Sequence, residues 1–305
     1  MRRSVSEVIR RGFDNTVANW PLLLIRLGES LVAMMIVFAT ILAAVVPVVV
    51  SIVQSSRLDV EHPDRMLELL TALITEHGML IAYLVVLGTV LLTFILAVRA
   101  FVEGGTARIL FDGEAAADTR GGFAAFDMQR WFDGGKSAWW PIFLIYNIVG
   151  CIAVLGALLP LVVVGALVAI GGTGSAIVGC IVVPILIIAM IVLAIIVALW
   201  NQKAIVICVA RGLGAVASVR AGWREVMDDF SRHFGVAALI ALITFAVAAG
   251  LSVMNIASGF GHRAGLALAF APMQLISSFA QSALSAAAGT WFVACFVALT
   301  GDNRR

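Results

Sequence analysis

Six long apolar stretches constrain this chain more than any other feature of its sequence. They cover approximately residues 30–53, 79–98, 140–170, 176–200, 236–257 and 266–299. A helix needs about 20 apolar residues to cross the hydrocarbon core of a bilayer, and each stretch is long enough. No segment between them is long enough to bury a soluble core. The sequence therefore predicts an all-α, polytopic integral membrane helix bundle with six transmembrane helices in a single domain, residues 1–305.

The composition agrees with a chain that is solvated by lipid. Of the 305 residues, 62% are hydrophobic and 12% are charged, whereas a soluble domain carries about 25% charged residues. The net charge of +2 argues against a nucleic-acid partner. The four cysteines each lie in a short apolar run without a CxxC spacing, which predicts free thiols and no disulfide or metal site.

The placement of the basic residues predicts the orientation. Of the 20 lysine and arginine residues, 17 fall on one side of the six-span layout, and only Arg57, Arg65 and Arg263 fall on the other. Basic segments stay on the cytoplasmic side, so both termini are predicted to be cytoplasmic. Arginine outnumbers lysine 18 to 2, which we interpret as the codon bias of a GC-rich bacterium. We therefore expect a multi-pass inner-membrane protein whose charged segment 1–28 is amphipathic and whose first span is a retained anchor.

Two similar segments precede the first and third apolar stretches. The chain reads RRGFDNTVANWPLLLI at residues 10–25 and QRWFDGGKSAWWPIFLI at residues 129–145. A looser third copy, DDFSRHFGVAALI at 228–240, precedes the fifth stretch. This internal repeat predicts three hairpins, each preceded by a cytoplasmic amphipathic segment. The matched pairs are Arg11 with Arg130, Phe13 with Phe132, Asp14 with Asp133, Trp20 with Trp140, and Pro21 with Pro141.

The pre-hairpin segments have the pattern of helices at a membrane surface. Ser4 and Glu7 form a capping box that predicts a helix start. Aromatic rings beside arginines suit the membrane–water interface, and a docking surface for another membrane protein is the alternative. One apolar stripe is predicted for Val5, Ile9, Phe13, Val17 and Trp20, and another for Val216, Val219, Trp223, Val226 and Phe230. The candidate interfacial or docking residues are Arg11, Phe13, Trp20, Arg130, Phe132, Trp140, Arg220, Trp223 and Arg224.

Two further segments carry a family resemblance. FVEGGTARILFDGEAA (101–116) follows the second span, and KAIVICVARGLGAVASVRAGWREV (203–226) runs off the fourth. In the latter, a glycine precedes an A-x-x-S-x-x-x-x-W stretch that begins at Ala215. This layout resembles the membrane domain appended to some bacterial glycerophosphodiester phosphodiesterases and its stand-alone relatives of unknown function. The resemblance implies a membrane-domain fold, but no catalytic residues, because the 305 residues contain no phosphodiesterase domain.

The spans offer little material for catalysis or ion coupling. Arg26, Glu29 and Arg99 fall at span edges, where they can reach water, and the spacing of Arg26 and Glu29 predicts an ion pair. No histidine falls deep in a span, which argues against haem ligation. His62, His77 and His262 are assigned to the outer face, where metal binding stays open although no ligand spacing supports it. We predict no catalytic, cofactor-binding or metal-binding residues and no cofactor.

The sixth stretch carries the clearest polar pattern inside the membrane. Gln274, Ser278, Gln281 and Ser285 recur at spacings of four, three and four, which places them on one helix face. Such side chains commonly hold helices together through interhelical hydrogen bonds, and a polar lining for a solute path is the alternative. Asn147 and Asn255 are the candidate partners on other spans.

These features favour a non-enzymatic membrane protein that acts as a scaffold, assembly factor or accessory subunit. Its expected partners are membrane lipids and other membrane proteins. A facilitator or transporter component for a small or lipidic solute, lined by the Gln/Ser face, is the alternative. An intramembrane enzyme is disfavoured because no set of catalytic side chains is visible.

Overall fold

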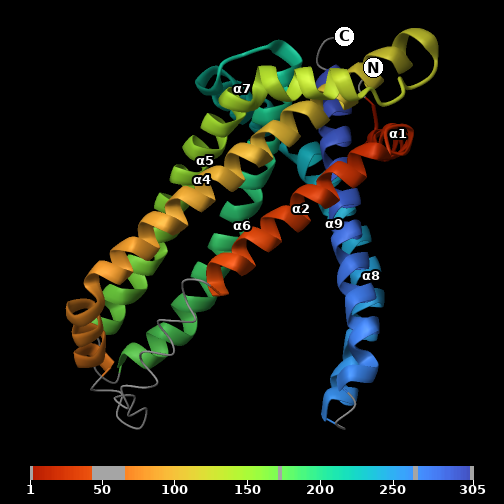
Figure 1. The fold of residues 1–305 in the computed structure, drawn as a ribbon. Coiled ribbons are helices and arrows are strands. Elements are labelled where there is room, and N and C mark those ends of the chain that lie inside the picture. Colours follow the sequence, from red (N-terminus) through yellow and green to blue (C-terminus); the bar gives the residue numbers. More distant parts are fainter. Residues whose placement is uncertain (1–2, 43–65, 171–173, 264–266, 303–305) are drawn as a thin grey trace. The chain divides into compact units, whose positions relative to one another are not determined.

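Helices account for nearly all of the residues that the computed structural model describes, which are 3–42, 66–170, 174–263 and 267–302. These ranges contain no β-strand, which confirms the all-α fold. Six helices are long and apolar enough to cross a membrane, so the chain is a multi-pass membrane protein (Figure 1). The helices are α1 (Val5–Ala18), α2 (Pro21–Thr40), α4 (Met66–Arg120), α5 (Met128–Ile170), α6 (Gly174–Arg211), α7 (Ala215–Asp228), α8 (Phe230–Arg263) and α9 (Ala267–Asp302).

The chain divides into two compact units. One unit contains residues 28–99, which are most of α2 and the first part of α4. In this unit Val32 and Ile36 of α2 lie near Phe94 and Val98 of α4. The other unit contains residues 1–27 and 100–305, and it includes every site discussed below.

Several helices extend well beyond the predicted spans. Helix α5 runs without a break from Met128 to Ile170, so the second pre-hairpin segment is not a separate helix, contrary to expectation. Pro141 lies inside this helix. A proline removes one backbone hydrogen bond, but packing on either side of it can keep a long helix continuous. Here Trp131 and Ala138 before the proline, and Ile142 and Ile145 after it, are all buried.

The two separate pre-hairpin helices turn their large apolar side chains outward. Ser4 caps α1 as predicted, because its hydroxyl accepts a hydrogen bond from the Glu7 amide at 3.3 Å. The predicted stripes share one side of each helix, but the protein covers only part of each stripe. In α1 the buried residues are Val8, Ile9, Gly12, Asn15 and Thr16, whereas Phe13, Val17 and Trp20 are exposed. In α7 they are Ala215, Ser218, Val219, Gly222 and Val226, whereas Val216 and Trp223 are exposed.

Small buried faces let each pre-hairpin segment pack closely on a spanning helix of a different hairpin. Helix α1 packs on the C-terminal part of α9, and α7 packs on the C-terminal part of α6. The start of α5 packs on the part of α4 that follows Ala100, where Trp131 contacts Gly105. We use the name polar base for these packed segments together with the start of α8. The base thus contains α1, α7, the starts of α5 and α8, the C-terminal parts of α6 and α9, and the part of α4 that follows Ala100. In Figure 1 the labels α1 and α7 lie at the same end of this unit as the N- and C-termini.

The α1–α9 and α7–α6 crossings share one local geometry. Trp291 of α9 donates its indole N–H to the Ile9 carbonyl of α1 at 3.0 Å, and Trp200 of α6 donates to the Val219 carbonyl of α7 at 2.7 Å. Three residues after each accepting carbonyl comes a glycine, Gly12 or Gly222. That glycine contacts the residue four positions after the tryptophan. A glycine is required there because a side chain would collide with the facing backbone.

The structure predicts that Gly222→Ala destabilises the protein. A β-carbon at Gly222 would lie 2.9 Å from both the Cα and the amide nitrogen of Ala204, and backbone atoms cannot rotate away. The overlap should cost about 1–3 kcal/mol, against a gain of roughly 0.5–1 kcal/mol from better helix propensity. Thermal unfolding of the detergent-solubilised protein should show a lower midpoint. Gly250→Ala in α8 is the matched control, because a β-carbon at Gly250 would meet nothing within 4 Å. This variant should not lower the midpoint. A midpoint unchanged in Gly222→Ala would contradict this account of the crossing.

Candidate functional site

Buried charged side chains gather in the polar base. Glu103, Glu114, Lys203 and His233 are each no more than 4% exposed. No sequence pattern pointed to the two glutamates or Lys203, because these residues follow the apolar stretches and lie outside the predicted spans. Burying an ionised group is costly unless it is paired and hydrogen-bonded. The partners of these groups therefore define what the base can do.

Lys203 connects three helices. Its side chain on α6 has no solvent exposure, and its ammonium group donates to Thr300 Oγ1 of α9 at 2.9 Å. The same group lies 3.1 Å from Glu225 Oε2 of α7, and Arg211 binds the other oxygen of that carboxylate. Burial opposes ionisation of Glu225, but the charges of Lys203 and Arg211 outweigh it and hold the pKa of this carboxyl below its ordinary value. The carboxylate is thus kept negative to neutralise a buried cation.

A second group of charges fastens the N-terminus to α4. The guanidinium groups of Arg3 and Arg11 both lie 2.6 Å from Glu114 Oε1, and both also pair with Asp118. Arg11 was predicted as an interfacial or docking residue. Its side chain is only 23% exposed and is used within the chain, so we assign it a structural role.

Arg26 forms a third buried pair. Its guanidinium lies 2.6 Å from Glu103 Oε2 of α4, and both side chains are largely buried. The expectation from spacing was a pair with Glu29 of the same helix. The structure adds a partner 77 residues away, which spacing within one helix does not reveal.

The other predicted interfacial residues lie on the outside of the base. Phe13, Trp20, Phe132 and Trp140 are each more than half exposed, and Trp223 is 42% exposed. Arg130, Arg220 and Arg224 are exposed as well. Some of these rings also have partners within the chain, since Phe13 packs edge-on against Trp291 and Trp223 against Trp200. The base therefore presents aromatic and basic side chains together.

The predicted Gln/Ser face of α9 does not form a single contact surface. Ser278 and Ser285 are exposed and Gln281 is half-buried, whereas the neighbouring Ser277 is buried and donates weakly to the Leu251 carbonyl of α8 at 3.5 Å. Asn147 donates to the Phe143 carbonyl of its own helix at 2.8 Å. The side chains of Gln274 and Asn255 lie outside the described residues, as do those of His62, His77 and His262.

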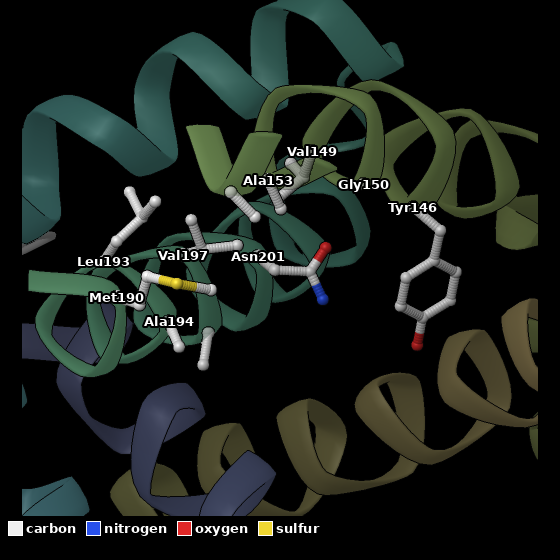
Figure 2. Close-up of a pocket in the computed structure, with 11 residues that line it drawn as sticks. Tyr146, Val149, Gly150, Ala153, Met190, Leu193, Ala194, Val197 and Asn201 are labelled. Atoms are coloured by element: carbon white, nitrogen blue, oxygen red, sulfur yellow. The ribbon is translucent and has the colours of Figure 1, made fainter. Parts of the chain in front are cut away.

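A groove lies between α5 and α6. It has a volume of about 440 Å³ and is lined almost entirely by apolar side chains. Tyr146 and Asn201 are its polar members, and Figure 2 shows the Asn201 amide projecting from α6 among apolar neighbours such as Met190 and Val197. A volume of this order falls in the range of small-molecule sites, about 300–1,000 Å³.

Comparisons with protein families, with curated proteins and with solved structures found no match to this chain. The resemblance to a phosphodiesterase-linked membrane domain therefore stays a prediction. Among the described residues, no three His, Cys, Asp or Glu side chains cluster in a way that could hold a metal ion. The base is held together by ion pairs between helices, and the α5–α6 groove is an apolar hollow of small-molecule size.

The depressed pKa of Glu225 predicts a specific loss of stability in acid. Because the folded protein binds this proton less readily than the unfolded chain, the stabilisation is complete above the unfolded pKa and disappears as pH falls through the folded one. Glu225→Gln should cost about 3 kcal/mol at pH 7 by leaving Lys203 without its counter-charge. Unfolding midpoints of the two proteins should converge below the ordinary glutamate value of 4.5.

Asp228→Asn is the matched control, since Asp228 is an exposed carboxylate on the same helix. It should leave the midpoint nearly unchanged at pH 7. A difference between wild type and Glu225→Gln that stays constant from pH 7 to pH 3.5 would contradict the charge-pairing account.

Proposed function

We propose that this protein is a non-enzymatic membrane protein of the bacterial inner membrane that acts as a scaffold, assembly factor or accessory subunit. The observation that carries the proposal is the low burial of five of its six candidate spans within the protein, the exception being that of α9 at 56%. In the most apolar windows of α5, α6 and α8, only 17%, 6% and 11% of the residues are buried within the protein. Spans that are so little buried within the protein leave most of their apolar surface available for contact with other membrane proteins and lipids.

The polar base supports this role by holding the hairpins from one end. The segment of α9 from Val293 to Leu299 is buried on all sides, at no more than 2% exposure, and α1, α6 and α8 pack around it. Figure 1 shows the α5–α6 and α8–α9 hairpins leaving this end in different directions. A well-packed base with diverging apolar hairpins is suited to organising other membrane components around it.

The alternative of a solute facilitator has less support. A transporter path needs polar groups that face an enclosed space within the membrane. In the described part of α9, Ser278 and Ser285 face outward, and no hydrogen bond links Gln281 to Asn147. We also propose that the chain belongs to the phosphodiesterase-linked membrane-domain family. The support for this proposal is the sequence of segments 101–116 and 203–226.

The orientation predicted by the basic residues can be tested with fusions. Green fluorescent protein joined to the C-terminus should fluoresce, because it folds in the cytoplasm, and alkaline phosphatase at the same place should be inactive. Alkaline phosphatase inserted within residues 54–77, predicted to be outside, should be active. The reverse pattern would overturn the assignment of the 17 basic residues to the cytoplasm.

The scaffold role predicts that a membrane partner remains bound after mild solubilisation and depends on the exposed side of the base. Purification from native membranes, followed by mass spectrometry, should recover the same partner reproducibly. The double variant Trp223→Ala/Arg224→Glu should reduce its recovery at least about tenfold, since exposed aromatic and arginine side chains dominate many contacts. Phe245→Ala, which truncates a 72% exposed ring on α8 away from the base, is the control. A protein that purifies alone and monomeric from native membranes would contradict the role.

A further inference from the structure

The groove between α5 and α6 exists because small residues face each other across two spans. Gly150, Ala153 and Ala157 line it from α5, and Ala194 and Ala198 line it from α6. A β-carbon at Gly150 would meet nothing within 4 Å, whereas one at Gly156 would lie 2.9 Å from Leu193. The helices are therefore in close contact at Gly156 and leave open space beside it.

The position of the groove decides what can fill it. Its α5 side falls within the span Met128–Leu158 and its α6 side within the span Val182–Arg211. Gly150, Ala194 and Ala198 are exposed, so the groove is open along its length within the two spans. An apolar hollow offers water too few hydrogen bonds to hold it. In a bilayer the available apolar filler is the acyl chain of a lipid.

One end of the groove carries an unsatisfied polar group. Asn201 Oδ1 is buried and accepts no hydrogen bond from any described residue. It lies next to Trp200 and two residues before Lys203, where the apolar span gives way to the polar base. Leaving such an acceptor unpaired costs about 1–3 kcal/mol, so a donor from a bound molecule would be favoured there.

We propose that this groove is a binding site for a membrane lipid, with an acyl chain between α5 and α6 and a headgroup N–H or O–H donated to Asn201 Oδ1. Phosphatidylethanolamine and phosphatidylglycerol carry such donors, whereas the headgroup of phosphatidylcholine has none. The site thus distinguishes lipids by hydrogen bonding and not by chain alone. This inference does not rest on the scaffold role, since a lipid can occupy the groove in either case.

Native mass spectrometry of the full-length protein tests the site, with lipids that share the same pair of acyl chains. The wild type should retain phosphatidylethanolamine and phosphatidylglycerol about 3- to 10-fold more than phosphatidylcholine, as one net hydrogen bond predicts. Asn201→Leu should remove this preference. Ala153→Leu and Ala194→Leu, which fill the groove from opposite walls, should each reduce retained lipid of every kind by one molecule.

Ala249→Leu, which adds the same bulk on an exposed face of α8, should leave lipid retention unchanged and controls for loosely bound annular lipid. Thermal midpoints of all variants show which of them are folded. Equal retention by wild type, Ala153→Leu and Ala249→Leu would overturn the site. A preference that persists in Asn201→Leu, or that favours phosphatidylglycerol alone and so reflects charge, would overturn the hydrogen-bond assignment. Retention of a protein in place of lipid, lost in Ala153→Leu, would also overturn the proposal.

Discussion

A single buried ammonium group sets the conditions for the rest of the base. Lys203 has no exposed side-chain surface, so its charge is tolerable only while Glu225 and Thr300 remain within hydrogen-bonding distance. Those partners come from α7 and α9, and α6 supplies the lysine. Separating α7 from α6 would leave the lysine without its counter-charge, and separating α9 would remove one of its hydrogen bonds. The interaction contributes geometry more than net stability, because desolvation offsets much of the Coulomb attraction.

Close backbone approach makes that geometry possible. Gly222 brings α7 close enough to α6 for Glu225 to reach Lys203, and Gly12 brings α1 against α9 in the same manner. In both crossings a tryptophan of the spanning helix hydrogen-bonds a carbonyl of the helix that crosses it. The segments that precede hairpins are thus structural parts of the base, and their outward sides carry the aromatic and basic residues suited to an interface. One face of each short helix packs against a spanning helix, and the opposite face exposes aromatic and basic side chains.

Outside the polar base, the apolar spans depend on the lipid or protein that surrounds them. Spans that bury little of their surface in each other need lipid or partner helices to solvate them. The α5–α6 groove is a local instance, since small residues on both walls leave a volume that the described residues do not fill. Scaffolding and lipid binding are compatible on this view, because both depend on apolar surface left open by the chain.

Much of the fold could be predicted, because helix formation in a membrane depends on local composition. The six apolar stretches and the Ser4 cap were found in the sequence for that reason. The division of the apolar stripes of α1 and α7 could not be predicted, since periodicity places residues on a face without saying whether protein or lipid covers it. The Gln/Ser pattern on α9 stays a prediction, since polar spacing places residues on one face without identifying the groups that they contact.

The sequence by itself determined the all-α membrane class, because about 20 consecutive apolar residues have few other stable environments. Only the tertiary structure decided which charges are buried, since Lys203 with Glu225 and Arg26 with Glu103 are separated in sequence and meet only after the helices cross. The groove was decided in the same way. Alanine and glycine permit close packing or leave a hollow, and the approach of the facing helix selects between them.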